Sequence, residues 1–552
     1  MNQVRLFFTL VAIALCCGAI AMQAQVTTAT IYGTVIDPSG AAIAGATVTV
    51  TSEQTGTVVH ATSGASGEVS VPPLPVGRYT IRVEAQGFKS EDRTGVELVA
   101  GQNMSLTFSL VLGSTTDTVA VTAEAPMLTT TTAQQESEVS SLQVRELPLV
   151  RRDWTNLLTL TPGMALASSA GGSAGVSLNG LPPASMHLTL DGGDSEADEE
   201  APGLSMYGNF NFIKSVSVEA IDEVNVAKGI AGADIANTMS GNVNIITKSG
   251  SNSIHGSLFE NFQSSDTNAR NQFLTSKALV VFNQFGGSLG GPVIKNKVFF
   301  FFAYEGYRQV AFAPVSGNVP TAEFKAVAIA AQPSYKAILS EFPLPTSPYA
   351  PGAVTGVYSA AGRGGADDDH TDFRMDYHLS DSNLITGRYS QGFPFKLTPS
   401  AQVVDYQTQT GKTEEGTISW LHLRSNWSSE TRFTFDQPNL VRVNNEYNLG
   451  VPDISGNLGF GTAESGSLFY KGGDTATLEH NFVRRIGRHN LKFGGAGSAP
   501  GHGSRKPGTA RHAVRKRSGL FGRSHEPRGD RLGSDQRIGP DAPVRGIYPG
   551  RF

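Results

Sequence analysis

The sequence predicts a mainly β protein with an N-terminal β-sandwich, a small α+β domain and an incomplete transmembrane antiparallel β-barrel. Three observations support this fold class. The 552-residue chain is rich in glycine (62) and phenylalanine (29) and only 16% charged, which suits strands and tight turns better than helical bundles. Segments with alternating apolar and polar residues recur along the chain, as expected of strands that bury one face. After the N-terminal segment, no apolar stretch has the length of a transmembrane helix.

Residues 1–24 have the layout of a signal peptide. Arg5 precedes an apolar run, and small residues at Ala21 and Ala24 predict that cleavage follows one of these two positions. Both cysteines of the chain lie within this segment. The exported chain therefore has no thiol, which excludes disulfides, thiolate metal sites and cysteine nucleophiles.

Residues 28–112 predict a small β-sandwich. Short alternating segments are separated by turn signals such as Asp37-Pro38-Ser39-Gly40. This unit resembles the carboxypeptidase regulatory-like domain, a transthyretin-like sandwich, most clearly in LPVGRYTIRVEAQGF (74–88). The resemblance implies a binding or spacer module with no peptidase activity, since the unit has no zinc-ligand pattern.

Residues 113–136 are rich in threonine and alanine and almost uncharged, which predicts an extended linker. A β-prone run within it is able to add as a strand to the sheet edge of another protein. It looks like a TonB box, the peptide by which an energising partner pulls on outer-membrane transporters, and the alternative is a plain strand of the neighbouring domain. The candidate TonB box consists of Asp117, Thr118, Val119, Ala120, Val121, Thr122 and Ala123.

Residues 137–250 predict a small α+β domain. Trp154, Leu157 and Leu158 have helical spacing before a Pro-Gly stop. Short strands separated by glycine follow.

Residues 251–497 predict the strands of a partial outer-membrane barrel. The segment DFRMDYHLSDSNLITGRYSQ (372–391) alternates apolar and polar residues around a polar turn, with about ten residues per strand. The segment 283–308 predicts a hairpin with its turn at Gly290-Gly291-Pro292, because proline has no place in a paired central position. Two similar hairpins are expected at 416–437 and 476–495.

Several blocks in collinear order resemble the plug and barrel of Oar-like TonB-dependent receptors. They include LTPG (160–163), LDG (190–192), AIDEVNV (220–226), TKSGSN (247–252), HGSLFE (255–260) and the segments 283–308, 374–390 and 487–495. The resemblance implies that residues 137–250 form a plug domain inside the barrel. It also implies a Gram-negative outer-membrane location and uptake of a large or scarce substrate by energy-coupled plug movement. The implied partners are a TonB-type energising protein, outer-membrane lipid and an unknown extracellular substrate.

Two carboxylate clusters, at 191–200 and 366–372, predict solvated acidic loops, with binding of a cation such as calcium as the alternative. The sequence has no HExxH or Walker-type motif. We therefore predict no enzyme, no cofactor and no metal site.

Residues 498–552 form an Arg- and Gly-rich tail with twelve Lys or Arg against four Asp or Glu. One interpretation is a tail that binds nucleic acid, but an exported protein would not meet nucleic acid. A second interpretation is a tail that faces lipopolysaccharide. We favour a third, a frameshift product, because the family resemblance stops at residues 494–497. Since the preceding segment supplies about ten strands, we expect a C-terminally truncated and impaired copy of a receptor with about twenty-two.

A different class of protein stays open as the alternative. A secreted or surface carbohydrate-binding or adhesion protein would also carry a β-sandwich module, and its remaining sheet would be soluble.

Overall fold

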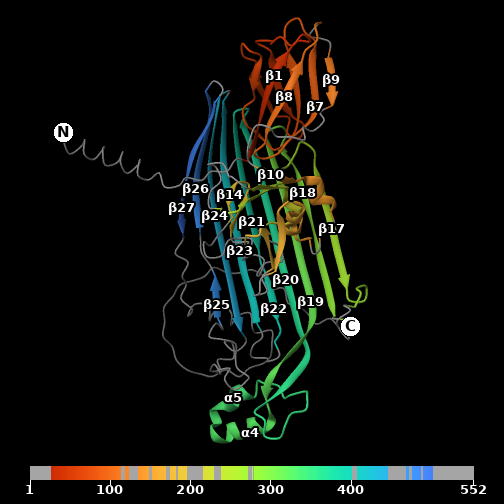
Figure 1. Ribbon diagram of the computed structural model, residues 1–552, viewed down its shortest axis with the longest axis vertical. Coiled ribbons are helices and arrows are strands. Elements are labelled where there is room, and N and C mark those ends of the chain that lie inside the picture. Colours follow the sequence, from red (N-terminus) through yellow and green to blue (C-terminus); the bar gives the residue numbers. More distant parts are fainter. Residues whose placement is uncertain are drawn as a thin grey trace, which may run out of the picture. The chain divides into compact units, whose positions relative to one another are not determined.

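The structure is a computed structural model, drawn as a ribbon in Figure 1. It describes residues 27–113, 118–122, 135–147, 149, 152–168, 174–181, 185–195, 216–228, 238–270, 277, 279–400, 407–424, 426–444, 468–471, 475–486 and 489–500. The expected signal peptide lies outside the described residues. Within these residues, no helix has both the length and the apolar character needed to cross a membrane.

The N-terminal β-sandwich consists of two sheets. The first contains β1 (Thr28–Ile36), β4 (Glu68–Ser70), β5 (Leu74–Pro75) and β8 (Asn103–Ser109). The second has the order β3 (Val58–Thr62), β2 (Thr47–Ser52), β6 (Gly77–Glu84), β7 (Ser90–Leu98) and β9 (Thr118–Thr122). Alternate side chains of the strands face the space between the sheets, where Ile31, Val48, Ile81 and Phe108 are at most 1% exposed. This is the packing that the alternating sequence predicts.

The segment expected to form a plug domain, residues 137–250, is called the plug below and is built on a five-stranded sheet. Its order is β10 (Gln135–Val139), β15 (Ile221–Lys228), β16 (Gly241–Thr247), β13 (Met186–Leu190) and β14 (Gly193–Asp194). The helices α2 (Ser141–Glu146), η2 (Trp154–Leu160) and η4 (Val218–Ala220) and the hairpin β11 (Met164–Ser168) and β12 (Ala174–Leu178) complete it. Trp154, Leu157 and Leu158 are buried in its core, as their spacing predicts. Gly241 is required in β16, since a Cβ there would lie 2.4 Å from the carbonyl oxygen of Ala227.

The barrel segment forms an antiparallel sheet of eleven strands in the part of the chain that the structure describes. The strands are β17 (His255–Ser264), β18 (Val280–Ile294), β19 (Val298–Pro320), β20 (Thr355–Ser380), β21 (Asn383–Gly392), β22 (Phe395–Thr398), β23 (Gln407–Arg424), β24 (Trp427–Asn444), β25 (Leu468–Lys471), β26 (Thr475–Ile486) and β27 (His489–Pro500). Figure 1 shows these long strands side by side. The hairpins predicted at 372–391, 416–437 and 476–495 are confirmed by the pairs β20–β21, β23–β24 and β26–β27.

The two faces of this sheet differ in chemistry. Asp368, Asp372 and Asp376 of β20 are at most 4% exposed, whereas Phe373 and Met375 between them are each 39% exposed. Large exposed apolar side chains continue around the same outer face: Leu258, Phe262, Phe302, Ile418, Trp420, Phe433, Leu478 and Phe493. An apolar outer face with a polar inner face is the pattern of a strand sheet that faces lipid.

The turn of the β18–β19 hairpin lies elsewhere than predicted. It is formed by Lys295-Asn296-Lys297, and the run Gly290-Gly291-Pro292 belongs to β18. Pro292 pairs with Phe299 beside an irregularity of the register. On its other side, β17 pairs only as far as Gly290, so position 292 has a strand partner on one side alone. Proline is tolerated at such a position because one of its edges needs no ladder hydrogen bond.

The last described strand is longer than the family resemblance predicts. Strand β27 pairs with β26 up to Pro500, opposite Thr475. The strand therefore continues three residues beyond residue 497, where the barrel segment was expected to end. The rest of the basic tail, residues 501–552, lies outside the described residues.

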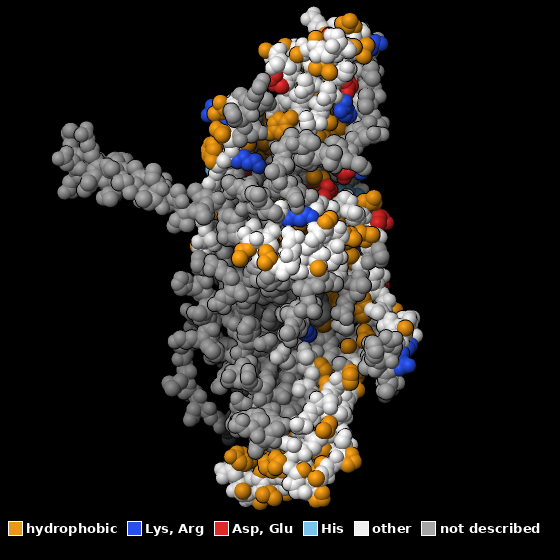
Figure 2. Space-filling model, viewed as in Figure 1, with side chains coloured by type: hydrophobic (Ala, Val, Ile, Leu, Met, Phe, Trp, Pro, Cys, Tyr) orange, Lys and Arg blue, Asp and Glu red, His pale blue; other side chains and the backbone are white. Residues whose placement is uncertain are grey.

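The β19–β20 hairpin ends in a small helical cap. It contains α4 (Ala322–Ala331), η5 (Pro333–Tyr335) and α5 (Lys336–Leu339). Ile338, Leu339 and Phe342 form an apolar cluster of their own in it. Figure 2 shows further hydrophobic side chains on the surface of this cap.

Candidate functional site

The candidate site is the contact between the plug and the polar inner face of the barrel sheet. Its centre is the turn between β13 and β14, at Asp191 and Gly192, where Asp191 adopts the left-handed conformation with a φ of 50°. The backbone N–H and hydroxyl of Thr247 donate to the two carboxylate oxygens of Asp191 at 2.9 and 2.7 Å. The Asp191 carboxylate is thereby fixed at the surface of the plug that meets the barrel.

Two arginines of the barrel wall converge on this carboxylate. Arg374 of β20 lies 3.3 Å from Asp191, and Arg388 of β21 lies 3.2 Å from it. Arg374 also donates to the carbonyl oxygen of Thr247 at 2.7 Å and pairs with Asp376 through two of its nitrogens. Because these side chains are buried, each charge depends on its partner for stabilisation.

A second connection links the plug to Glu415 of β23. The hydroxyl of Ser195 donates to Glu415 at 2.9 Å, and the other Glu415 oxygen pairs with Arg388. Ser195 is fully buried and Glu415 is 5% exposed. Arg388 therefore ties two separate points of the plug to the wall.

The third arginine, Arg432 of β24, holds the backbone of the same turn. It donates to the carbonyl oxygen of Gly192 at 2.9 Å and pairs with Glu479 of β26 at 3.0 Å and with Glu430. Its side chain is 1% exposed. A Cβ at Gly192 would lie 2.9 Å from the Arg432 guanidinium, so glycine permits this close approach.

Other plug residues complete the contact through hydroxyl groups. Ser217 donates its backbone N–H to Asp372 at 3.1 Å and its hydroxyl to Glu305. Ser249 donates to Asp376 at 2.6 Å. The plug is thus attached to the wall by hydrogen bonds and ion pairs, and Phe301 and Ala303 of β19 also pack into its apolar core.

Asp191 and Asp372 of the two predicted acidic loops belong to this contact, and residues 366–372 lie in strand β20, so the interpretation of the second cluster as a loop is wrong. Asp191 pairs with the barrel arginines, and the hydroxyl and N–H groups of the plug reach Asp372 and its neighbours on β20. Residues 196–200 lie outside the described residues. Among described residues, no group of three or more histidines, cysteines or acidic residues is placed to hold a metal ion.

A second polar contact joins the sandwich to the plug. The Glu223 carboxylate accepts a hydrogen bond from the N–H of Ala100 at 2.9 Å, and the Asn225 amide donates to the Ala100 carbonyl at 2.6 Å. Burial raises the pKa of Glu223 to about 8, and the nearby carboxylates of Glu138 and Asp222 add to the rise. This contact therefore responds to pH near neutrality.

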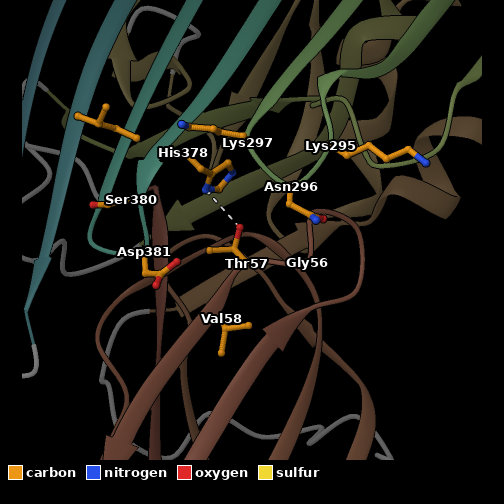
Figure 3. A pocket seen from close by; sticks show the side chains of 10 residues that line it. Gly56, Thr57, Val58, Lys295, Asn296, Lys297, His378, Ser380 and Asp381 are labelled. Carbon is orange, nitrogen blue, oxygen red and sulfur yellow. Dashed lines mark hydrogen bonds between the residues drawn. The ribbon is translucent and has the colours of Figure 1, made fainter.

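The sandwich also contacts the short turns of the barrel sheet, around a cavity of about 430 Å³ (Figure 3). The Thr57 hydroxyl lies 3.2 Å from the His378 ring nitrogen, and Asn252 donates to Asn296 at 2.7 Å. Lys295, Lys297 and Asp381 also line the cavity. Its lining is polar and its contacts are few, so we assign it no ligand.

Most of the candidate TonB box is part of the sandwich. Residues 118–122 form β9, which pairs in parallel with β7 from Ser90↔Thr118 to Thr94↔Thr122. Asp117 and Ala123 lie outside the described residues. The segment is separate from the plug contact described above.

Sequence reasoning missed the three barrel arginines. Each occupies an inward position of an alternating strand, at Arg374, Arg388 and Arg432. An arginine at a position where alternation predicts burial is a signal that a partner carboxylate faces it. That carboxylate belongs to Asp191, which lies both in the LDG block and in the acidic cluster 191–200.

Two families of protein domains match parts of the chain. Residues 246–502 match the family described as an outer membrane beta barrel domain, and residues 30–111 match the carboxypeptidase regulatory-like domain. The chain is 26% identical over 289 residues to the TonB-dependent transporter Oar of Myxococcus xanthus. That match covers 49% of this chain and 26% of Oar, so it spans about a quarter of the relative's length.

Solved structures of outer-membrane receptors are also similar. A mutant of the ferric enterobactin receptor PfeA from Pseudomonas aeruginosa is 13% identical, with a TM-score of 0.46 over 66% of this chain and 49% of that one. The outer membrane transporter YddB from Escherichia coli is 12% identical, with a TM-score of 0.43 over 65% of this chain and 47% of that one.

Proposed function

We propose that this homologue of the TonB-dependent transporter Oar, an outer-membrane protein, takes up a large or scarce substrate by energy-coupled movement of its plug. A TonB-type periplasmic protein pairs with the segment 117–123 and pulls on it. The pull reaches the plug at β10 and shifts it against the barrel wall. No catalytic step is part of this function.

The observation that carries the proposal is the polar attachment of the plug at Asp191 and Gly192. A hydrogen bond to a charged group in a protein has a modest net free energy, about 1.5–3 kcal/mol, since water replaces the partner when the bond breaks. A contact made of such bonds is able to open and close while water enters. Apolar packing would resist the same movement, because it exposes carbon to water.

The exposed apolar outer face of the sheet argues against the alternative, a secreted adhesion protein. Leu258 is 92% exposed and Phe493 is 58% exposed, which a water-soluble sheet would not tolerate over so many strands. A detergent-extracted barrel would change its gel migration on heating. A soluble protein would show no such change.

The test of the function is to label the plug contact in intact cells. The exported chain has no cysteine, so Ser195→Cys introduces a single thiol at a buried position facing Glu415. We expect a maleimide reagent to label it severalfold faster when the inner membrane is energised than after a protonophore is added. The matched control is Ser380→Cys, at an exposed position at the end of β20, whose labelling should not depend on energisation.

Deletion of residues 117–123 assigns the coupling segment. The deletion should remove the energy dependence of labelling and leave outer-membrane insertion unchanged. Deletion of the seven residues 124–130 is the matched control, because it shortens the same linker and keeps the candidate segment. If labelling still depends on energisation after residues 117–123 are deleted, the proposed coupling role is contradicted.

A further inference from the structure

We propose that the plug rotates about a hinge on the barrel wall: it stays attached to β17 and β19, and it separates from β21, β23 and β24. This inference rests on the function proposed above and names the part of the plug that moves. The contact with β17 and β19 is called the hinge side, and the contact of residues 191–195 with the other three strands is called the moving side. Phe301 and Ala303 of β19 are the positioning residues of the hinge.

The hinge side is closed by apolar packing. Phe301 and Ala303 are almost fully buried and belong to the same apolar cluster as Val218 of η4. A hydrogen bond from Ser217 to Glu305 of β19 supplements this packing. Opening this side would return carbon to water, which costs free energy in proportion to the area exposed. The hinge side is therefore the part of the contact that resists separation.

Strand β17 adds a second contact on the hinge side. The Arg152 guanidinium of the plug lies over the ring of Phe259, 3.9 Å from its centroid, where the electron-rich face of the ring attracts a cation. Arg152 also pairs with Glu219 of η4, and the Ser257 hydroxyl of β17 donates to the other oxygen of that carboxylate. The helix η4 is thus fixed to two barrel strands.

The chain itself passes from the plug to the barrel on the hinge side. Residues 248–254 join β16 of the plug to β17. The backbone N–H of Lys248 donates to the carbonyl oxygen of Ala220 at 2.7 Å, and its ammonium group donates to the carbonyl oxygen of Glu219 at 2.9 Å. Because this link is bound to η4, covalent connection and packing act at the same place.

The moving side has the opposite chemistry. Residues 191–195 meet Arg388 of β21, Glu415 of β23 and Arg432 of β24 through hydrogen bonds and ion pairs. Within the described residues, none of these three strands contributes a side chain to the apolar cluster of the plug. Water is able to replace each polar partner as the contact opens, and buried ion pairs add little net stability. A pull on the plug should therefore separate this side first.

The test compares single thiols on the two sides of the plug in intact cells. Ala303→Cys places the thiol on the hinge side and Ser195→Cys places it on the moving side, and both positions are fully buried. We expect maleimide labelling of the Ser195→Cys chain to become severalfold faster on energisation. Labelling of the Ala303→Cys chain should stay at its resting rate. Equal labelling of both chains after denaturation is the control that each thiol is reactive.

A substitution at Phe301 tests the hinge directly. In the Ala303→Cys chain, Phe301→Ala removes most of the apolar side chain beside the plug, so labelling at position 303 should become dependent on energisation. Phe301→Leu keeps a buried apolar side chain and should restore protection. Heat-dependent gel migration of every variant shows that the barrel is folded. Unchanged labelling after Phe301→Ala would contradict the role assigned to this residue.

The outcomes separate the hinge from the proposed function. If energisation exposes the thiols at both positions, the plug leaves the wall as a whole, so the hinge is wrong and the energy-coupled movement stands. If energisation exposes neither thiol, the movement and the hinge are both wrong.

Discussion

The sandwich and the plug–barrel contact bury their side chains in opposite ways. The sandwich interior is apolar, with Ile31, Ile81 and Phe108 enclosed between two sheets. The plug–barrel contact buries arginines and carboxylates, with Arg388 and Arg432 at most 2% exposed in their side chains. The first arrangement is stabilised by removing carbon from water, and it loses that free energy as soon as it opens.

The second arrangement gains much less by closing. Desolvation of buried charges costs nearly as much as their pairing returns, so an ion-pair contact adds little net stability while it strongly selects one alignment. We infer that the sandwich stays folded when the chain is pulled. The plug contact fixes the resting position of the plug and allows the plug to leave it. Four substitutions test this difference.

The largest effect is expected in the sandwich core. Phe108→Ala removes a fully buried ring and should lower the free energy of unfolding of the sandwich by about 3–5 kcal/mol. Chemical denaturation monitored by protease cleavage within residues 28–109 measures it. The control Val111→Ala changes a side chain that is 48% exposed and should have little effect; a similar loss in both variants would mean that the core is less important than we infer.

Arg432→Met should produce the next largest effect. It leaves the carboxylates of Glu430 and Glu479 without their cation, which costs about 3 kcal/mol or more in a buried site. The temperature at which the barrel loses its folded gel migration should fall. Arg484→Met, at an exposed position of β26, is the matched control and should leave that temperature unchanged.

A smaller, pH-dependent effect is expected at the sandwich–plug contact. The folded-state pKa of Glu223, about 8, lies above its ordinary value of 4.5, so the folded chain binds more protons than the unfolded chain between these values. The free energy of unfolding should therefore fall as pH rises through this window, by roughly 1–2 kcal/mol from pH 6 to pH 8.

Glu223→Gln should remove most of this dependence, because the amide stays neutral across the window. Thermal unfolding at a series of pH values measures it. Glu146→Gln, at a side chain 63% exposed, should keep the dependence of the unmodified chain. A flat profile in the unmodified chain would contradict the assigned pKa shift.

The smallest effect is expected at the surface of the sandwich. Arg78 and Glu97 approach to 3.9 Å with side chains 62% and 49% exposed. Exposed pairs of this kind contribute about 0–1 kcal/mol, so Arg78→Met should change the unfolding free energy by less than about 0.5 kcal/mol. A larger loss would show that a surface pair in this domain behaves like the buried pairs of the barrel.

The sequence predicts the strands well, because the alternation of apolar and polar residues reflects which side chains are buried. The pairs β20–β21, β23–β24 and β26–β27 follow from that pattern. The prediction misplaces the β18–β19 turn, because Pro292 and the glycines before it resemble turn residues. In the structure Pro292 lies within β18, where it has a strand partner on one side only. A local signal cannot report how far a neighbouring strand extends.

The site was less predictable than the fold. The partners of Asp191 lie more than 180 residues away on other strands, so no local spacing connects them. The acidic run 366–372 looks solvated because charged side chains usually are, and only the packing of the inner face of the sheet reverses that expectation, for Asp368 and Asp372. The candidate TonB box was predicted from its β-prone composition, whereas the pairing of residues 118–122 with β7 depends on a sheet edge that composition does not reveal.

The β19–β20 hairpin is long enough to extend well beyond the membrane at the cell surface. Strand β19 has 23 residues, about twice the 9–11 residues that cross a bilayer, so roughly 40 Å of paired strand extends past the lipid. It extends on the side opposite the short turns, which is the outside of the cell in outer-membrane barrels. The helical cap at its tip is therefore an accessible epitope, which presents exposed apolar side chains such as Val327 and Tyr335 to antibodies or bacteriophages.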